Sequence, residues 1–318
     1  MEERTQKYHY LLAAVLGVAG LLIILIFVSL RSQTSSVDTT VAVTNAAPTL
    51  STINVGSADG GSQYNDSYTP TAETTSTIYV SGVITDTNGC NDITTAGGDM
   101  FTVAFYTNTV GDVACNTIGE NEDTQCFYKV KTSDGCSLGS TDECSSAEDE
   151  TVSFVCSFAL PHYIDPDAWT SKVWVTDQNS GTVSSTQGLT VTTLTAFNYT
   201  ADIDYGTVAI RATSTEQTVN IINTGNDNDL DLQITLQAMD CSGSQKDIEY
   251  TNQFFSLSST GIVTSSMTKG DGSAQASALN LTKGTASAST PTLPVYFGLE
   301  VPAGAAGTCT GSTTITAN

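Results

Sequence analysis

The chain has 318 residues and a formal net charge of −23, with 10 Lys and Arg against 33 Asp and Glu. This acidic balance argues against nucleic acid and against an anionic membrane surface as partners, because both carry negative charge themselves. The length is enough for two ordinary domains.

Residues 10–30 form a long stretch without a charged side chain. A helix rises about 1.5 Å per residue, so about 20 apolar residues cross the roughly 30 Å hydrocarbon core of a bilayer. The stretch therefore predicts a single N-terminal transmembrane helix that acts as an uncleaved signal anchor. Two alternatives remain. A cleaved secretory signal needs a shorter apolar core and a small-x-small site, and a pilin-type leader needs Lys/Arg-Gly before the apolar run.

Basic residues around this stretch predict its direction in the membrane. Arg4 and Lys7 precede it, whereas Arg31 alone follows it closely. By the positive-inside rule, residues 1–9 stay in the cytoplasm and the bulk of the chain is extracellular, as in a single-pass protein of the cell membrane. Residues 31–47 are rich in Ser and Thr, which predicts a flexible stalk.

Beyond the stalk, β-branched and aromatic residues alternate between Gly, Asn and Asp turns, which predicts an all-β fold. We expect two tandem immunoglobulin-like β-sandwich domains, at 48–195 and 196–318. Predicted strands of the first domain lie at 49–55, 77–85, 100–107, 126–130, 151–160 and 172–176. Those of the second lie at 217–224, 230–237, 296–301 and 312–317, and a turn at 224–226 is expected to make a hairpin of the first two.

Four short segments carry motifs of known surface domains. NIINTGNDNDLDLQITL at 220–236 looks like an Asn-Thr-Gly-Asn hairpin, and VPAGAAGTCTGSTTITA at 301–317 looks like a closing strand. VSGVITDTNGCNDI at 80–93 and YIDPDAWTSKVWVTD at 163–177 look like paired motifs of a first domain. In these motifs the chain resembles prokaryotic membrane-anchored surface proteins with tandem immunoglobulin-like domains. The resemblance implies a sandwich fold and an envelope location, and no chemistry.

All 8 cysteines follow the predicted anchor, and an even number outside a membrane predicts disulfides. The second domain contains only Cys241 and Cys309, which are therefore expected to pair. Many pairings are open in the first domain. Local spacing favours Cys136 with Cys144 and Cys115 with Cys126, and this leaves Cys90 with Cys156.

The sequence offers little for catalysis. His162 is the only histidine beyond the predicted anchor, so a Ser or Cys nucleophile has no second candidate base. A Gly-x-Ser-x-Gly elbow, a P-loop and a dinucleotide fingerprint are absent from the sequence. Cys-x2-Cys spacing is absent as well, which disfavours zinc. We therefore expect a protein that is not an enzyme and has no cofactor, with calcium as the one open question.

Calcium fits the residue types, because it takes about six to eight oxygen ligands from carboxylates, amides and the main chain. Candidate ligands share the turn DTNGCND, namely Asp86, Asn88, Asn91 and Asp92. A second acidic region is flanked by Asp165, Asp167 and Asp177. Asp, Asn and Gly are also ordinary turn formers, so a purely structural interpretation of these turns stays open.

The predicted function is that of a membrane-anchored extracellular protein of structural or adhesive type. Two alternatives remain, namely a subunit of a surface filament or surface layer, which implies self-association, and a carbohydrate-binding module. Exposed Trp169 and Trp174 rings would support the last. Expected partners are the membrane, through residues 10–30, and an unidentified extracellular protein or glycan. Three Asn-x-Ser/Thr sequons begin at Asn65, Asn198 and Asn280.

Overall fold

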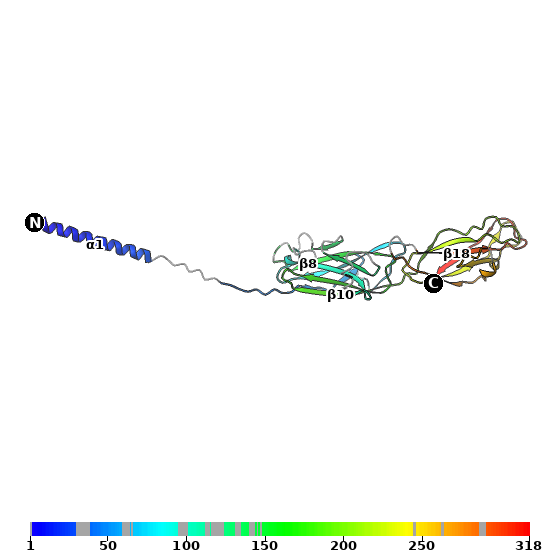
Figure 1. The fold of residues 1–318 in the computed structure, drawn as a ribbon, viewed down its shortest axis with the longest axis horizontal. Helices are drawn as coiled ribbons and strands as arrows, with labels where there is room; N and C mark the ends of the chain where they lie inside the picture. The colour runs from blue at the N-terminus through cyan, green and yellow to red at the C-terminus, as the bar shows by residue number, and fades with distance from the viewer. Residues whose placement is uncertain are drawn as a thin grey trace. The chain divides into compact units, whose positions relative to one another are not determined.

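A computed structural model gives the fold of the chain (Figure 1). It describes residues 2–29, 39–58, 64, 66–94, 101–111, 115, 124–130, 135–139, 144, 146, 148–243, 246–261, 264–285 and 291–318. The chain divides into two compact units, Met1–Thr44 and Asn45–Asn318.

The first unit contains the long helix α1 (Glu2–Ser29). Among the described residues, no helix is both long enough and apolar enough to cross a membrane. Residue 30 and the side chains of residues 23–29 belong to the predicted anchor and lie outside the described residues, as do residues 31–38 of the predicted stalk. The membrane anchor and the part of the stalk before residue 45 therefore stay predictions, whereas residues 45–47 belong with the sandwich that follows.

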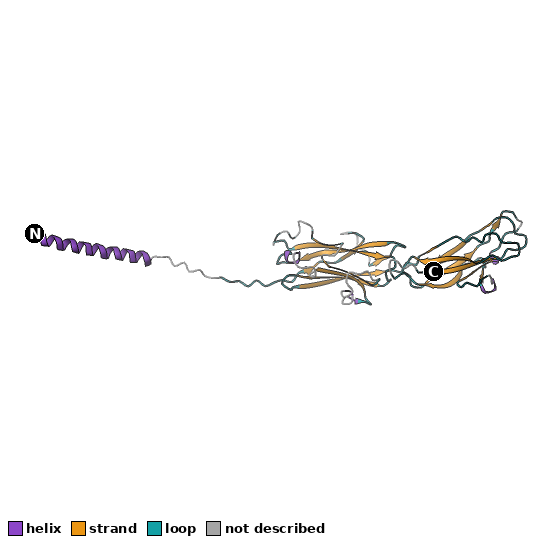
Figure 2. Ribbon diagram, turned by 45° about the horizontal axis from the view of Figure 1, so that its top comes forward, coloured by secondary structure: helices purple, strands orange, loops and turns teal. Residues whose placement is uncertain are grey.

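The second unit begins with a sandwich of two facing sheets (Figure 2). One sheet has the order β1 (Thr49–Leu50), β4 (Thr75–Thr85), β8 (Thr151–Pro161) and β7 (Cys136–Leu138), and β2 (Asn54–Gly56) also pairs with β4. The other has the order β3 (Ser67–Tyr68), β10 (Thr182–Val191), β9 (Ala168–Thr176), β5 (Phe101–Thr107) and β6 (Cys126–Val130). A short helix, α2 (Asn91–Thr94), follows β4.

The core of the first sandwich follows from alternation along its strands. In β8 every second side chain from Val152 to Leu160 is buried, and in β9 Val173 and Val175 are fully buried. The largest core side chain, Trp169, stacks on Phe105 with ring centroids 4.7 Å apart. Apolar burial of this kind contributes about 25 cal/mol per Å² of surface removed from water, which makes the inner faces the main source of stability.

Disulfides link the loops of this sandwich differently from the predicted scheme. The structure pairs Cys90 with Cys144 and Cys136 with Cys156, so the predicted pairs Cys136–Cys144 and Cys90–Cys156 are wrong. The physical reason is strand register. Cys136 lies on β7 directly opposite Cys156 on β8, whereas the sulfurs of Cys90 and Cys144 both lie near the carbonyl oxygen of Thr151. Cys115 pairs with Cys126, as local spacing predicts.

The second sandwich occupies the rest of the unit. One sheet has the order β11 (Phe197–Tyr199), β12 (Gln217–Asn223), β18 (Thr292–Leu299), β15 (Gln253–Ser256) and β16 (Thr268–Lys269). The facing sheet has the order β17 (Gln275–Leu281), β13 (Leu230–Leu236) and β20 (Thr313–Ala317). Two short 3-10 helices are η2 (Tyr250–Asn252) and η3 (Thr264–Ser266). In a separate ribbon, β14 (Asp240–Cys241) pairs with β19 (Cys309–Thr310), and the Cys241–Cys309 disulfide predicted from the sequence joins them.

The turn at residues 223–226 does not form the predicted hairpin. β12 and β13 lie in different sheets, so the turn is a corner that carries the chain from one sheet to the other. Its two asparagines are buried and bind main chain elsewhere. Asn223 donates to the carbonyl oxygens of Asp227 (2.7 Å) and Leu281 (3.1 Å), and the Asn226 side chain accepts from Leu194 N (2.5 Å). Buried amides need such partners, which explains why polar residues occupy the corner.

An ion pair joins the two sandwiches. Lys283, in the loop after β17, places its Nζ 2.5 Å from an Asp165 carboxylate oxygen and 2.8 Å from the carbonyl oxygen of Tyr163, which precede β9 in the first sandwich. The Lys283 side chain is 7% exposed. A buried ammonium needs such compensation, and this ion pair is one of several contacts at the junction between the sandwiches.

Candidate metal centre

Three carboxylates meet at one pole of the first sandwich. Asp86 follows β4 in one sheet, Asp177 follows β9 in the other, and Asp92 lies on α2. One oxygen of each lies within 4.8 Å of one of each of the others. Oxygens that bind one Ca²⁺ at about 2.4 Å are at most about 4.8 Å apart, so this spacing permits the three carboxylates to share a cation.

Asp86 is held in place by its own turn. The residue is fully buried, and its Oδ1 accepts a hydrogen bond from Asn88 N at 2.8 Å. Gly89, with φ of 106°, completes the turn in a conformation that favours glycine. The other oxygen, Oδ2, is buried and has no hydrogen-bond partner among the described residues. A charged oxygen removed from water without a partner is costly, so Oδ2 is available as a ligand to a cation.

Asp177 makes a similar turn from the facing sheet. It is fully buried, and its Oδ1 accepts from Asn179 N (2.8 Å) and Gly181 N (2.7 Å). Its Oδ2 accepts from the Asn45 side-chain amide at 2.8 Å. A Cβ at residue 181 would collide with this carboxylate and would lie 2.9 Å from Ala47 Cα, so glycine is required for the close approach.

Asp92 completes the cluster, and its Oδ1 is also buried without a hydrogen-bond partner in the described part of the chain. Burial, together with the negative charges of Asp86 and Asp177, raises the pKa of Asp92 above its ordinary value. Two desolvated, unpaired oxygens in a cluster of three acids are unfavourable when ionised, and a bound cation removes that penalty.

The structure brings together only part of the predicted ligand set. Asp86 and Asp92 meet as expected, whereas the Asn88 side chain accepts from Ala46 N at 2.6 Å and the Asn91 side chain is exposed. The sequence assigned Asp177 to a separate acidic region. Two members of that region lie elsewhere in the fold, in contact with other groups, namely Asp165 with Lys283 and Asp167 with Ala168 N.

A signal for Asp177 was present in the sequence. Ile-Thr-Asp-Thr-Asn-Gly at 84–89 and Val-Thr-Asp-Gln-Asn-Ser-Gly at 175–181 are variants of one pattern, a buried strand that ends in Thr-Asp followed by Asn and Gly. Both aspartates turn the chain in the same way, because each Oδ1 accepts from the backbone N–H two residues later. Two such strand ends on facing sheets at one pole place two carboxylates together.

The residues considered for catalysis and sugar binding lie elsewhere. His162 is half-buried and packs edge-on against Tyr163, and burial lowers the pKa of its imidazole while the charge of Glu73 opposes this. Trp169 is 1% exposed, so it offers no ring face to a glycan. Trp174 lies under Lys172, whose Nζ is 4.6 Å from the ring centroid. The tryptophan pair therefore does not support the carbohydrate alternative.

Two of the three predicted sequons begin at residues that the structure describes. Asn198 and Asn280 are exposed, and the Asn198 side chain donates to the carboxylate of Glu73 at 3.0 Å. Asn65 lies outside the described residues.

No family model and no curated protein matches the chain. Among solved structures, the chain is similar to dimeric latent PorU from Porphyromonas gingivalis, with 13% identity, a TM-score of 0.28 and coverage of 86% of this chain. It spans 20% of the length of that protein. At these values the likeness says nothing about function.

Two further solved structures are complexes with pilus adhesins. One is the CsuC–CsuE chaperone–tip adhesion subunit complex from the archaic chaperone-usher Csu pili of Acinetobacter baumannii, with 14% identity, a TM-score of 0.33 and coverage of 79% of this chain and 96% of that one. The other is a chaperone–tip adhesin complex of CFA/I fimbriae biogenesis, with 12% identity, a TM-score of 0.29 and coverage of 83% of each chain. These likenesses are as weak as the first.

Proposed function

We propose that this chain is a non-enzymatic extracellular surface protein, anchored in the cell membrane through residues 10–30, whose first sandwich binds one calcium ion. The observation that carries the proposal is the fully buried, unpartnered Oδ2 of Asp86 beside the carboxylates of Asp92 and Asp177. Four disulfides support an oxidising location outside the cytoplasm, because thiols are kept reduced inside most cells.

Calcium suits this site better than zinc or magnesium. The cluster offers only carboxylate oxygens, whereas zinc sites use His and Cys. Magnesium requires near-ideal octahedral geometry and keeps several waters, whereas calcium accepts irregular sets of oxygens such as carboxylates on three different segments. Extracellular calcium modules bind with dissociation constants of about 10⁻⁴ to 10⁻³ M, which a site with three acids can reach.

The cation would tie the entering chain to the sandwich. Asn45 binds Asp177 and Ala46 N binds Asn88, so residues 45–47 rest on the two turns that supply the ligands. These residues were predicted to belong to the flexible stalk, and they are instead attached to the sandwich pole. Ordering both turns around one cation would make this attachment stiffer, which suits a protein that holds sandwich domains away from a surface.

Calorimetric titration of calcium into the full chain tests the proposal. We expect one calcium per chain, at least tenfold weaker binding in Asp86→Asn and Asp177→Asn, and no change in Asp271→Asn. Asparagine keeps the oxygen that accepts the turn hydrogen bond, so the two site variants should fold. Asp271 is a matched control, because it is exposed in the second sandwich and its Oδ1 accepts from Ser273 N in the same way. Wild-type binding that survives both site substitutions, or no binding at millimolar calcium, would contradict the proposal.

A second candidate function is a self-associating subunit of a surface filament or layer. The observation that favours it is the outer edge of β20 in the second sandwich, which pairs with no strand in the described part of the chain, since an unpaired edge is a template for another strand.

A further inference from the structure

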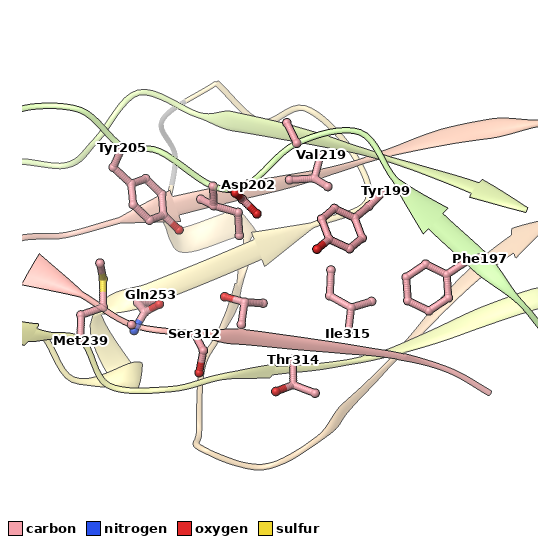
Figure 3. A pocket seen from close by; sticks show the side chains of 14 residues that line it. Phe197, Tyr199, Asp202, Tyr205, Val219, Met239, Gln253, Ser312, Thr314 and Ile315 are labelled. Atoms are coloured by element: carbon pink, nitrogen blue, oxygen red, sulfur yellow. The ribbon is translucent and has the colours of Figure 1, made fainter.

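A groove in the second sandwich runs between the edges of its two sheets. Its volume is about 550 Å³. Phe197 and Tyr199 of β11, with residues 201–203 and Tyr205, form one wall, and residues 311–315 form the other (Figure 3). Figure 3 shows the Ile315 and Val219 side chains directed into the space between the walls. Val219 belongs to the buried core, so core surface is accessible from this groove.

β20 forms one wall of the groove and has an open edge. It stands at the end of the order β17-β13-β20, and β13 is its strand partner in the described part of the chain. Asn318 N donates to Asp231 O at 3.0 Å. In an antiparallel pair, every second residue directs its main-chain groups toward the partner strand, so this bond tells which residues of β20 face β13. The main-chain N–H and C=O groups that point away from β13 are therefore those of Thr313, Ile315 and Ala317.

The groove and the open edge of β20 together define the chemistry of the ligand. A row of outward main-chain groups is matched by another extended main chain, and the apolar part of the groove, at Phe197, Val219 and Ile315, can accommodate every second side chain of such a strand. The net charge of the chain is −23, and Asp202 lies in the groove wall, so an acidic strand would be repelled. The ligand that fits is a strand without acidic residues and with alternating aliphatic residues.

We propose that this strand is residues 39–44 of a second copy of the chain. Their sequence, Thr-Thr-Val-Ala-Val-Thr, is uncharged, and its β-branched residues favour an extended conformation. Val41 is 85% exposed and Val43 is 80% exposed, more than any other large hydrophobic residue in the described part of the chain. As alternate residues of a strand they share one face, so both enter the groove when the segment pairs with β20.

The proposal goes beyond the calcium-binding function and does not require it. It accounts for two features together, an exposed apolar segment and an open sheet edge, each of which is unfavourable in water on its own. Pairing of residues 39–44 of one copy with β20 of another would cover the apolar segment and the open edge at the same time. Since the donor and acceptor surfaces differ, the contact is heterologous, and successive copies can continue it.

Self-association of the full chain is the first test. We expect wild type to sediment as a concentration-dependent oligomer and Val41→Ser/Val43→Ser to shift its association constant at least tenfold toward monomer. Ile210→Ser is the matched control, because Ile210 is an aliphatic residue exposed by 56% outside the segment and the groove. α1 is present in every variant, so its own association cannot produce the difference.

A synthetic peptide of residues 39–46 is the second test. It should bind the Val41→Ser/Val43→Ser chain, and the same peptide with both valines replaced by serine should bind at least tenfold more weakly. Thr313→Pro/Ala317→Pro should abolish binding, because proline removes outward N–H groups and leaves the bonds to β13 intact. If the proline variant melts early, Ile315→Thr replaces it as the groove variant. A monomeric wild type, an oligomer unchanged by the serine substitutions, or peptide binding that survives the groove variants would overturn the proposal.

Discussion

The two sandwiches have the same layered architecture and differ in what completes them. The first contains three of the four disulfides and a buried carboxylate cluster that joins the ends of its two sheets. The second has one disulfide, and among the described strands the outer edge of β20 has no partner beside the groove. The difference teaches that sandwiches of the same layered architecture can be cross-linked internally, as by the three disulfides of the first, or can present an open sheet edge, as the second does in the described part of the chain.

The cores of the two sandwiches also differ, because the first has more aromatic packing than the second. Phe105, Phe127, Phe158 and Trp169 contact one another in the first, where ring packing adds to the burial of area. The main core cluster of the second sandwich is mainly aliphatic, with Phe255 and Phe297 as its buried aromatic residues in the described part of the chain, and Phe254 is buried outside that cluster. We therefore expect the second sandwich to depend more strongly on its single disulfide.

Removing that disulfide should give the largest effect. Cys241→Ser/Cys309→Ser opens a loop with a sequence separation of 68, and chain-entropy reasoning gives a loss of about 4 kcal/mol in the free energy of unfolding. The matched change in the first sandwich, Cys115→Ser/Cys126→Ser, opens a separation of 11 and should cost about 3 kcal/mol. Denaturant unfolding of the full chain, followed by hydrogen exchange of each sandwich, measures both. A larger loss of unfolding free energy in the first sandwich than in the second would contradict this expectation.

Breaking the junction should have the next largest effect. Lys283→Met leaves the Asp165 carboxylate without its cation, and removal of one partner of such a pair costs about 3 kcal/mol. Lys269→Met is the control, because Lys269 is an exposed lysine of the second sandwich. Thermal unfolding should show a loss in Lys283→Met that Asp165→Asn partly restores. If the double variant is no more stable than Lys283→Met, the ion pair does not couple the sandwiches.

The pH dependence of stability should give a smaller effect than these substitutions. Its sign should differ between Asp92 of the first sandwich and Asp271 of the second. Burial and the charges of Asp86 and Asp177 raise the pKa of Asp92, so without divalent cations the folded state holds its proton more tightly than the unfolded state does. The contribution of Asp92 to stability is then lost as pH rises from the ordinary carboxyl pKa through the folded value. Asp92→Asn should remove this loss, and calcium should remove it in the wild type.

Asp271 of the second sandwich gives the contrasting slope. Hydrogen bonds from Ser273 lower its pKa, so its contribution is present above the ordinary carboxyl pKa and is lost as pH falls through the folded value. Thermal melts of wild type, Asp92→Asn and Asp271→Asn between acidic and neutral pH separate the two cases. Parallel curves for wild type and Asp92→Asn without calcium would show that the cluster is not desolvated.

Much of this architecture could be predicted from local sequence. The alternation of Val173 and Val175 with Trp174 identifies both the strand and its buried face, because a strand has a period of two. Cys241 and Cys309 could be paired because no other cysteine lies in the second domain. The first inference needs only the chain near the residues concerned, and the second needs only the boundary of the domain.

The predictions that were wrong or incomplete depended on strand register and on which sheet each strand joins. Cys136 pairs with Cys156 because β7 lies against β8 in one particular register, which spacing along the chain does not encode. The turn after Asn223 was taken as a hairpin, although its strands belong to different sheets. Asp177 joins Asp86 because β4 and β9 end at the same pole, and only the repeated Thr-Asp pattern hinted at this. Contacts of this kind depend on the packing of whole sheets.

A crystal structure of the full chain grown with calcium tests the central claim most directly. The account predicts one cation at the pole of the first sandwich, bound by Asp86 Oδ2, Asp92 Oδ1 and Asp177 at about 2.3–2.6 Å, with its remaining ligands from main-chain carbonyls or water. Calcium density absent from this cluster at saturating calcium, with the Asp86 and Asp92 oxygens hydrogen-bonded to each other through a shared proton, would contradict it.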